Sequence, residues 1–169
     1  MDTTLARTML LDVFDRFLAD LTGLLDGLDE DALAWRPAPE ANPIGWIAWH
    51  VTRVQDDHFA DLGEIDQAWV AAGWRERFDL PYEPMAHGYG HSDADVAAWR
   101  GTADHLIGYA KDVHTLTRRV LGGLTDYERI VDEHWDPPVT AAGRLVSVVD
   151  EVNQHLGQIA YIKGLYDHR

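Results

Sequence analysis

The chain has 169 residues, a formal net charge of −15 and no cysteine. This length suits one domain with a hydrophobic core and is short for two. The charge disfavours nucleic acid and anionic membranes as partners, because phosphate groups would be repelled. The lack of cysteine excludes disulfides, thiolate metal ligands and a cysteine nucleophile, so any thiol chemistry must use a thiol that arrives with a substrate.

The sequence shows no targeting or membrane segment. Its N-terminal stretch lacks the charged and apolar regions of a signal peptide. No apolar run approaches the roughly 20 residues that span a bilayer. We therefore expect a cytoplasmic protein that does not bind membranes.

The N-terminal half predicts two long helices and a connector. Residues 3–26 carry apolar side chains at three- and four-residue intervals, which is typical of an amphipathic helix. Residues 28–42, rich in proline and acidic residues, predict a connector with one short turn. Asn42 and Pro43 then indicate a helix start, with Asn42 as the N-cap and Pro43 at the first helical position. The helix over 44–62 is apolar around most of its first three turns, which predicts a central position.

The C-terminal half predicts two more long helices. Residues 63–91 contain one short helical stretch and then a loop rich in glycine, proline and aromatic residues, which we expect to pack as a lid. The Ser-Asp-Ala-Asp sequence at Ser92 matches a capping box and opens a helix over 92–121. A connector with a short helix at 126–131 follows. A last helix, capped by threonine, is predicted over 140–167.

These elements define the expected fold class. Four long helices, one or two short ones, a long loop between the second and third long helices and no alternating strand pattern predict an all-α protein, a four-helix bundle in one domain over 1–169. The seven tryptophans leave two alternatives open. Either some form an exposed surface that mediates a homodimer, or all belong to the core.

Polar side chains on the last predicted helix suggest a metal site. Glu151 and His155 are four residues apart, so both leave the same helix face. Because ligands in a bundle converge from facing helices, His50 on the apolar central helix is the candidate third ligand. Two imidazole nitrogens and one carboxylate oxygen suit zinc, nickel or ferrous iron. Three protein ligands leave a position open for water or substrate, which is typical of a catalytic site.

Plainer interpretations exist for each part of this pattern. A Glu-x-x-x-His pair is common on solvated helix surfaces, and a histidine among tryptophans is often a hydrogen-bonded core residue. His87 and His91 flank Gly-Tyr-Gly and either bind metal or, as we expect, supply polar groups at the mouth of the site. His58 lies about 80° round the helix from His50, which favours a surface role.

The chain resembles the DinB-like superfamily. The resemblance rests on the four-helix pattern, on Trp-His50-Val-Thr-Arg53 in the second long helix, and on Glu151-Val-Asn-Gln-His155-Leu-Gly-Gln158 in the last. It spans essentially the whole chain, including the Trp-Asp-Pro-Pro connector. Within the superfamily, the sequence is similar to the branch that includes mycothiol-dependent maleylpyruvate isomerase and related actinobacterial thiol transferases. Many members carry His-x-x-x-His in the last helix, and this chain has Glu151 at the first position, as the isomerase branch does.

The resemblance implies a ligand set and a reaction. It implies that His50, Glu151 and His155 hold a divalent metal, with zinc ranked before nickel or iron, and that Gln158 lies beside the ligands. The implied enzyme is a metal-dependent thiol transferase or isomerase that activates a low-molecular-weight thiol, such as mycothiol, for attack on a small electrophile.

The surrounding residues leave alternatives open. Trp46 and Arg53 lie one turn from His50 on the same helix and are expected near the ligands or the substrate. Arg53 either binds a carboxylate or sugar-acid group or pairs with Asp57 at i+4. A metal-dependent hydrolase is the alternative enzyme, but it wants a free carboxylate as general base, and Asp150 points about 100° away from the ligand face. A non-catalytic bundle that binds metal or a small molecule is the alternative outside enzymes.

Overall fold

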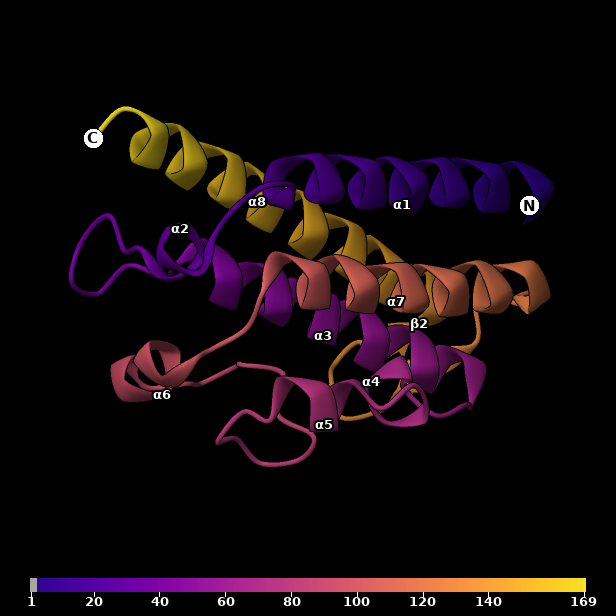
Figure 1. Cartoon of the computed structure of the whole chain (residues 1–169). Helices are drawn as coiled ribbons and strands as arrows, with labels where there is room; N and C mark the ends of the chain where they lie inside the picture. Colours follow the sequence, from indigo (N-terminus) through magenta and orange to yellow (C-terminus); the bar gives the residue numbers. More distant parts are fainter. Residues whose placement is uncertain (1–2) are drawn as a thin grey trace.

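The computed structural model describes residues 3–169 and is mainly helical (Figure 1). The predicted all-α fold with four long helices is confirmed. α1 and α3 each pack against both α7 and α8, which closes the bundle around one core. The long helices are α1 (Thr3–Leu25), α3 (Ile44–Gly63), α7 (Ala103–Gly123) and α8 (Ala141–Asp167).

The second long helix, α3, runs through the middle of the molecule. Every residue from Ile44 to Arg53 is buried, as the apolar composition of these turns predicted. The Phe59 ring of α3 packs edge-on against Phe14 of α1, with 5.0 Å between the ring centroids. His50 is therefore held within the core by its helix, and only 7% of its surface is exposed.

Short elements fill the connections between the long helices. There are four short helices in residues 3–169 rather than the one or two expected: α2 (Glu30–Ala34), α4 (Ala68–Ala71), α5 (Trp74–Phe78) and α6 (Asp93–Ala98). Asp29 caps α2 by accepting a hydrogen bond from the amide of Ala32 (2.8 Å). The short strands β1 (Ile130–Asp132) and β2 (Val139–Thr140) pair antiparallel.

The predicted third long helix is divided in two. Ser92 and Asp95 form the expected capping box, but the helix that they open, α6, ends at Ala98. The next residue, Trp99, has an extended backbone and buries its ring against Gly45 of α3, where a Cβ would approach the ring to 2.2 Å. We attribute the break to this packing, because the chain leaves the helix where the ring enters the core. A new helix, α7, then starts behind Thr102, whose hydroxyl caps it.

Two local predictions are wrong. Pro43 rather than Asn42 is the N-cap of α3, because the backbone of Pro43 is still extended (φ −79°, ψ 159°). No side chain forms a capping hydrogen bond at this end of the helix. Residues 126–131 do not form a helix. The Asp126 carboxylate accepts hydrogen bonds from two following amides in a turn that leads into β1. Thr140 caps α8 as predicted, accepting from the amide of Gly143 (3.0 Å).

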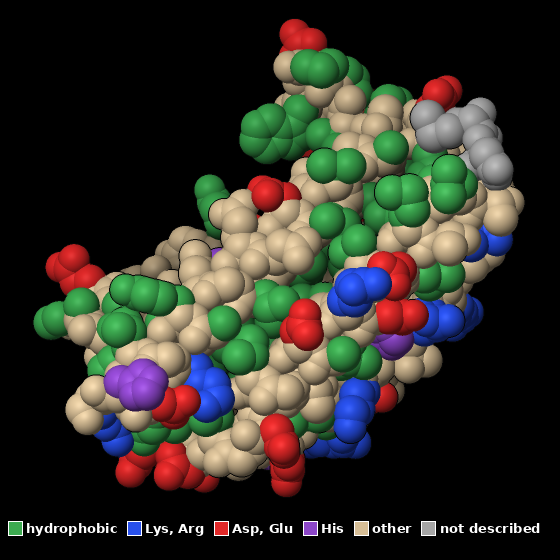
Figure 2. All heavy atoms as spheres, turned by 90° about the horizontal axis from the view of Figure 1, so that it is seen from above, with side chains coloured by type: hydrophobic (Ala, Val, Ile, Leu, Met, Phe, Trp, Pro, Cys, Tyr) green, Lys and Arg blue, Asp and Glu red, His purple; other side chains and the backbone are tan. Residues whose placement is uncertain are grey.

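The tryptophans belong to the interior. Five are buried, Trp35 is partly buried, and only Trp135 is largely exposed (67%). Within residues 3–169 the tryptophans form no exposed surface, so the alternative in which they belong to the core holds for all but Trp135. On the face shown in Figure 2, acidic side chains are spread among apolar and basic ones rather than gathered in one place. No helix in residues 3–169 is both long and apolar enough to cross a membrane.

Candidate metal centre

Three side chains from two helices converge at the edge of the core. His50 extends from α3, and Glu151 and His155 extend from one face of α8. Glu151 Oε1 lies 3.2 Å from His50 Nε2 and 3.0 Å from His155 Nε2. Within residues 3–169, these are the only three His, Asp or Glu side chains grouped closely enough to hold a metal ion, with ligand atoms all within 4.8 Å of one another.

A backbone carbonyl fixes the orientation of the His50 ring. His50 Nδ1 donates a hydrogen bond to the carbonyl oxygen of His87, in the loop between α5 and α6. A carbonyl can only accept, so Nδ1 carries the proton and Nε2 presents its lone pair to Glu151. The ring also stacks on Trp46, with centroids 4.9 Å apart and planes 13° from parallel. Burial lowers the pKa of His50, which favours this neutral form.

The His155 ring is oriented from its own helix. Its Nδ1 lies 2.7 Å from Oε1 of Gln158, one turn further along α8. The amide oxygen accepts the proton of Nδ1, which leaves Nε2 free to coordinate. The Nε2 atoms of the two histidines therefore both point at one carboxylate oxygen.

This donor set fits a divalent metal. Ligand atoms about 2.1 Å from one tetrahedral ion are about 3.4 Å from each other, close to the observed 3.0 and 3.2 Å. When both Nε2 atoms carry lone pairs, a cation between them and the carboxylate oxygen would stabilise the arrangement. The oxygen acceptors on both Nδ1 atoms are the partners that metal-binding histidines commonly have. His50, Glu151 and His155 could therefore hold a metal ion.

One side of the group is open to solvent. The side chains of His50 and His155 are 9% and 16% exposed, whereas that of Glu151 is 34% exposed. Access is thus from the Glu151 side, and the α3 side is closed by Trp46 and the core. A site closed on one side and open on the other suits a ligand that must enter and leave.

The glycine-rich loop passes close to His50 without supplying a ligand. Neither His87 nor His91 belongs to the group of donor atoms. His91 instead accepts a hydrogen bond from Nε1 of Trp46 (3.4 Å). Gly88 has a φ of +97°, and a Cβ at this position would lie 2.8 Å from His50 Nδ1. Only glycine lets the loop approach the ring this closely.

Arg53 and His58 differ from their expected positions. Arg53 is fully buried and pairs with Asp56 (Nη1 to Oδ2, 3.6 Å) rather than with Asp57. It therefore has no exposed atom with which to bind a substrate carboxylate. His58 is half-buried and accepts a hydrogen bond from Arg144 of α8 (2.7 Å), so it is not a free surface side chain.

Sequence reasoning missed the contacts made by the loop backbone. The carbonyl of His87 orients His50, but a backbone carbonyl leaves no residue-type signal in a sequence. The nearest available signal was the Gly-Tyr-Gly sequence at 88–90, because paired glycines indicate backbone conformations that other residues avoid. Both Gly88 and Gly90 have positive φ angles.

Comparison with known proteins establishes the family. A family model described as the DinB superfamily matches residues 14–159. The match covers most of the chain, so this protein belongs to the DinB superfamily, which includes metal-dependent enzymes. A crystal structure of a conserved protein from Enterococcus faecalis is similar, with 25% sequence identity and a TM-score of 0.87 over 96% of this chain and 97% of that chain. No curated protein matches the sequence. The mycothiol-dependent branch stays a prediction.

Proposed function

We propose that this protein is a metal-dependent enzyme that activates a low-molecular-weight thiol for attack on a small electrophile. The observation that carries the proposal is the convergence of His50 Nε2, Glu151 Oε1 and His155 Nε2. Three protein ligands leave coordination positions free, which is typical of catalytic rather than structural sites. Zinc is the first candidate, with nickel or ferrous iron as alternatives.

The charge of the donor set suits an anionic sulfur ligand. A divalent ion, when bound, would lower the pKa of a coordinated thiol and so supply a thiolate nucleophile near neutral pH. Glu151 contributes one negative charge and the two neutral histidines contribute none. The filled site would then keep a net charge of about +1, which favours an anion over a neutral ligand.

The proposed reaction needs no nucleophile from the chain. The thiol gives its proton to water, and its sulfur forms a bond to an electrophilic carbon. In a transfer, a leaving group departs from that carbon with the bonding electrons. In an isomerisation, the sulfur adds to a carbon–carbon double bond and breaks its π bond, the remaining single bond rotates, and the double bond re-forms as the thiolate leaves and takes up a proton. The absence of cysteine agrees with a thiol that enters as cosubstrate. Mycothiol is the proposed thiol, because the sequence resembles the mycothiol-dependent branch.

Within residues 3–169, the group of donor atoms holds no additional carboxylate or imidazole that could serve as the general base of a hydrolase. Hydrolysis would want a free carboxylate or imidazole near the ligands, and no further His, Asp or Glu in residues 3–169 joins the group. Asp150 is next to Glu151 in sequence, but it is exposed and accepts a hydrogen bond from Gln154 (2.6 Å) on another face of α8. The geometry therefore favours thiol activation over water activation.

The test is an assay of thiol dependence. Zinc-loaded, untagged protein is mixed with a chromogenic model electrophile and one thiol. Mycothiol, glutathione and cysteine are tested in separate assays. We expect turnover above the uncatalysed background with at least one thiol, a thioether product in the mass spectrum, and loss of turnover in His155→Ala. Turnover without any thiol would show a hydrolase instead. No turnover with any thiol, from protein that holds stoichiometric metal, would contradict the proposal for this electrophile class.

A further inference from the structure

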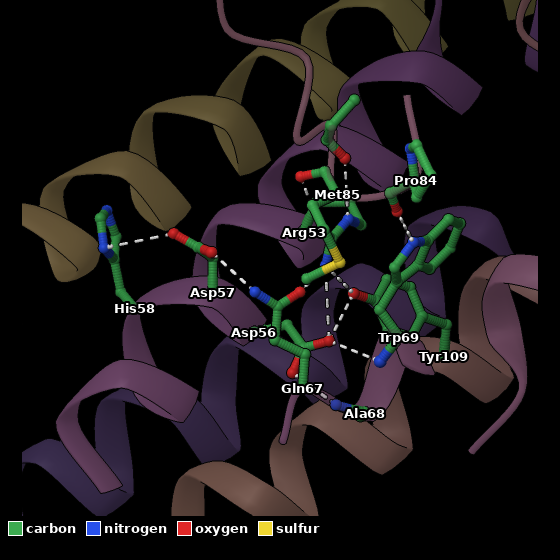
Figure 3. A network of polar contacts seen from close by, with 11 residues as sticks. Arg53, Asp56, Asp57, His58, Gln67, Ala68, Trp69, Pro84, Met85 and Tyr109 are labelled. Atoms are coloured by element: carbon green, nitrogen blue, oxygen red, sulfur yellow. Dashed lines mark hydrogen bonds and ion pairs between the residues drawn. The ribbon is translucent and has the colours of Figure 1, made fainter. Parts of the chain in front are cut away.

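Successive carbonyl groups in the loop before His87 are held by side chains rather than by backbone partners. The carbonyl of Pro84 accepts from Nε1 of Trp69 (2.9 Å). The next two, of Met85 and Ala86, accept from Nη2 (3.2 Å) and Nε (3.0 Å) of one arginine, Arg53. Figure 3 shows this guanidinium between the loop and the helices behind it. A single buried side chain thus fixes two consecutive peptide groups.

The fourth carbonyl in this run is the one that orients a proposed metal ligand. His87 follows Ala86 directly, and its carbonyl accepts from His50 Nδ1. His50 and Arg53 are three residues apart on α3, so their side chains leave the same face one turn apart. Side chains of α3 therefore donate to the carbonyls of residues 85, 86 and 87 in order. The position of His87 then depends on the hydrogen bonds from Arg53 to Met85 and Ala86.

Arg53 is itself held on the side away from the loop. Its Nη1 donates to Oε1 of Gln67 (2.8 Å) and to the hydroxyl of Tyr109 (3.1 Å). Asp56 lies 3.6 Å from the same atom and accepts from the Tyr109 hydroxyl (2.7 Å). The guanidinium also lies over the Trp69 ring, 4.9 Å from its centroid. A bidentate, planar donor fixed on several sides has little freedom to move.

We infer that Arg53 is a positioning residue of the metal centre, which acts through the loop backbone rather than on the substrate. The inference rests on the proposed metal site. If the hydrogen bonds from Arg53 to the carbonyls of Met85 and Ala86 are lost, the carbonyl of His87 no longer stays opposite His50 Nδ1. The ring is then free to adopt the tautomer with its proton on Nε2, which cannot bind a metal through that atom.

Lysine at position 53 tests the inference. Arg53→Lys keeps the charge opposite Asp56, but a single ammonium group cannot donate to the carbonyls of Met85 and Ala86 in the geometry of the guanidinium. We expect zinc to bind about 10- to 100-fold more weakly, measured by competition with a chromophoric chelator. We also expect a changed visible absorption spectrum with Co²⁺ in place of zinc. In the metal-free variant, the ¹⁵N shifts of His50 should show a mixture of tautomers where the unmutated protein shows Nδ1–H.

Thr117→Val is the matched control. It removes a buried hydroxyl that accepts a hydrogen bond from Gln55 Nε2 (2.8 Å), a contact in which Arg53 takes no part. We expect a lower Tm, as in Arg53→Lys, but an unchanged zinc Kd, Co²⁺ spectrum and His50 tautomer. Equal effects of both variants on zinc binding, or no effect of Arg53→Lys on the Kd and tautomer, would overturn the inference.

A second variant covers the case in which Arg53→Lys does not fold. Trp69→Phe keeps an aromatic ring but removes the donor to the Pro84 carbonyl, at the start of the same run. Weaker zinc binding and tautomer mixing in Trp69→Phe would then support the inference, and unchanged values would overturn it. If the unmutated protein binds no metal, the proposed function is wrong, and the His50 tautomer in the metal-free variants still decides the positioning role.

Discussion

His50 Nε2 and Glu151 Oε1 lie 3.2 Å apart although their residues are separated by 101 positions in the chain. α3 and α8 bring them together only when the bundle is formed. The group of three donor atoms therefore forms only in the folded protein, so that binding of the proposed metal would be thermodynamically linked to folding.

Removal of the metal should lower the Tm without unfolding the protein. At a free metal concentration of 100 times the Kd, binding contributes about 2.7 kcal/mol, which corresponds to a Tm shift of roughly 5–10 °C for a chain of this size. The core packs without the metal, since the ligands lie at its edge. Differential scanning calorimetry with and without a chelator measures the shift. A chelated protein that is unfolded at 25 °C would instead show a structural metal.

Gln158 should tune the affinity for metal through His155. Gln158→Ala removes the oxygen that accepts from His155 Nδ1 (2.7 Å), and we expect about tenfold weaker zinc binding. Gln158→Glu keeps an acceptor and adds charge, so its zinc binding should be at least as strong as that of the unmutated protein. Gln154→Ala is the control, because Gln154 lies on the same helix but bonds to Asp150. Equal zinc affinities in the two alanine variants would rule out this role.

Alanine variants at two glycines of one loop distinguish the effect of backbone strain from that of contact with His50. Gly88 and Gly90 both have positive φ, so alanine at either position should cost roughly 1–2 kcal/mol of stability. Only at Gly88 would the new Cβ collide with His50 Nδ1, whereas it meets nothing within 4 Å at Gly90. We expect Gly88→Ala to weaken zinc binding and Gly90→Ala to leave it unchanged. Zinc titration of both variants checks this, and weakening in both would point to loop strain alone.

Asp15 should stabilise the contact between α1 and α7 in a pH-dependent way. Its carboxylate accepts from Arg118 (2.6 Å) and is 2.7 Å from Nε2 of His114. The hydrogen bond from Arg118, partly opposed by burial, lowers the pKa of Asp15 below its ordinary value of 3.8. The stabilisation is therefore present above pH 3.8 and is lost as the pH falls through the lowered pKa.

The corresponding variant is Asp15→Asn. Because the pair is partly exposed, we expect it to lose roughly 0.2–1 kcal/mol at pH 6, and less as the pH falls below 3.8 towards the lowered pKa of Asp15. Urea unfolding of both proteins over a series of pH values below 6 gives this difference as a function of pH. A difference that does not shrink as the pH falls would mean that the ion pairs are not its source.

Much of the fold follows from residue patterns along the chain. The apolar stripes predicted α1, α3 and α8 to within a few residues, and Thr140 marked the start of α8. The breaks depend on contacts between distant segments. Trp99 leaves its helix to pack on Gly45, and this long-range contact has no local signal. Residues 126–131 also have no strand pattern of their own, and β1 forms by pairing with β2.

The candidate site was predictable to a similar extent. The spacing of Glu151 and His155 placed both on one face of α8, and the apolar helix around His50 suggested a partner. The role of Arg53 could not be predicted, because a buried arginine bound to carbonyls has the same sequence signal as one that binds a substrate. Charge and spacing identify side chains that can meet, but backbone partners are known only from the fold.

The metal content of untagged protein tests the central claim most directly. Elemental analysis after purification and zinc loading should give about one zinc per chain, and His155→Ala should lose most of it, because one of the three ligands is gone. His134→Ala is the control, because His134 is 94% exposed and lies outside the group. Zinc retained in His155→Ala, or absent from the unmutated protein, would contradict the metal centre proposed here.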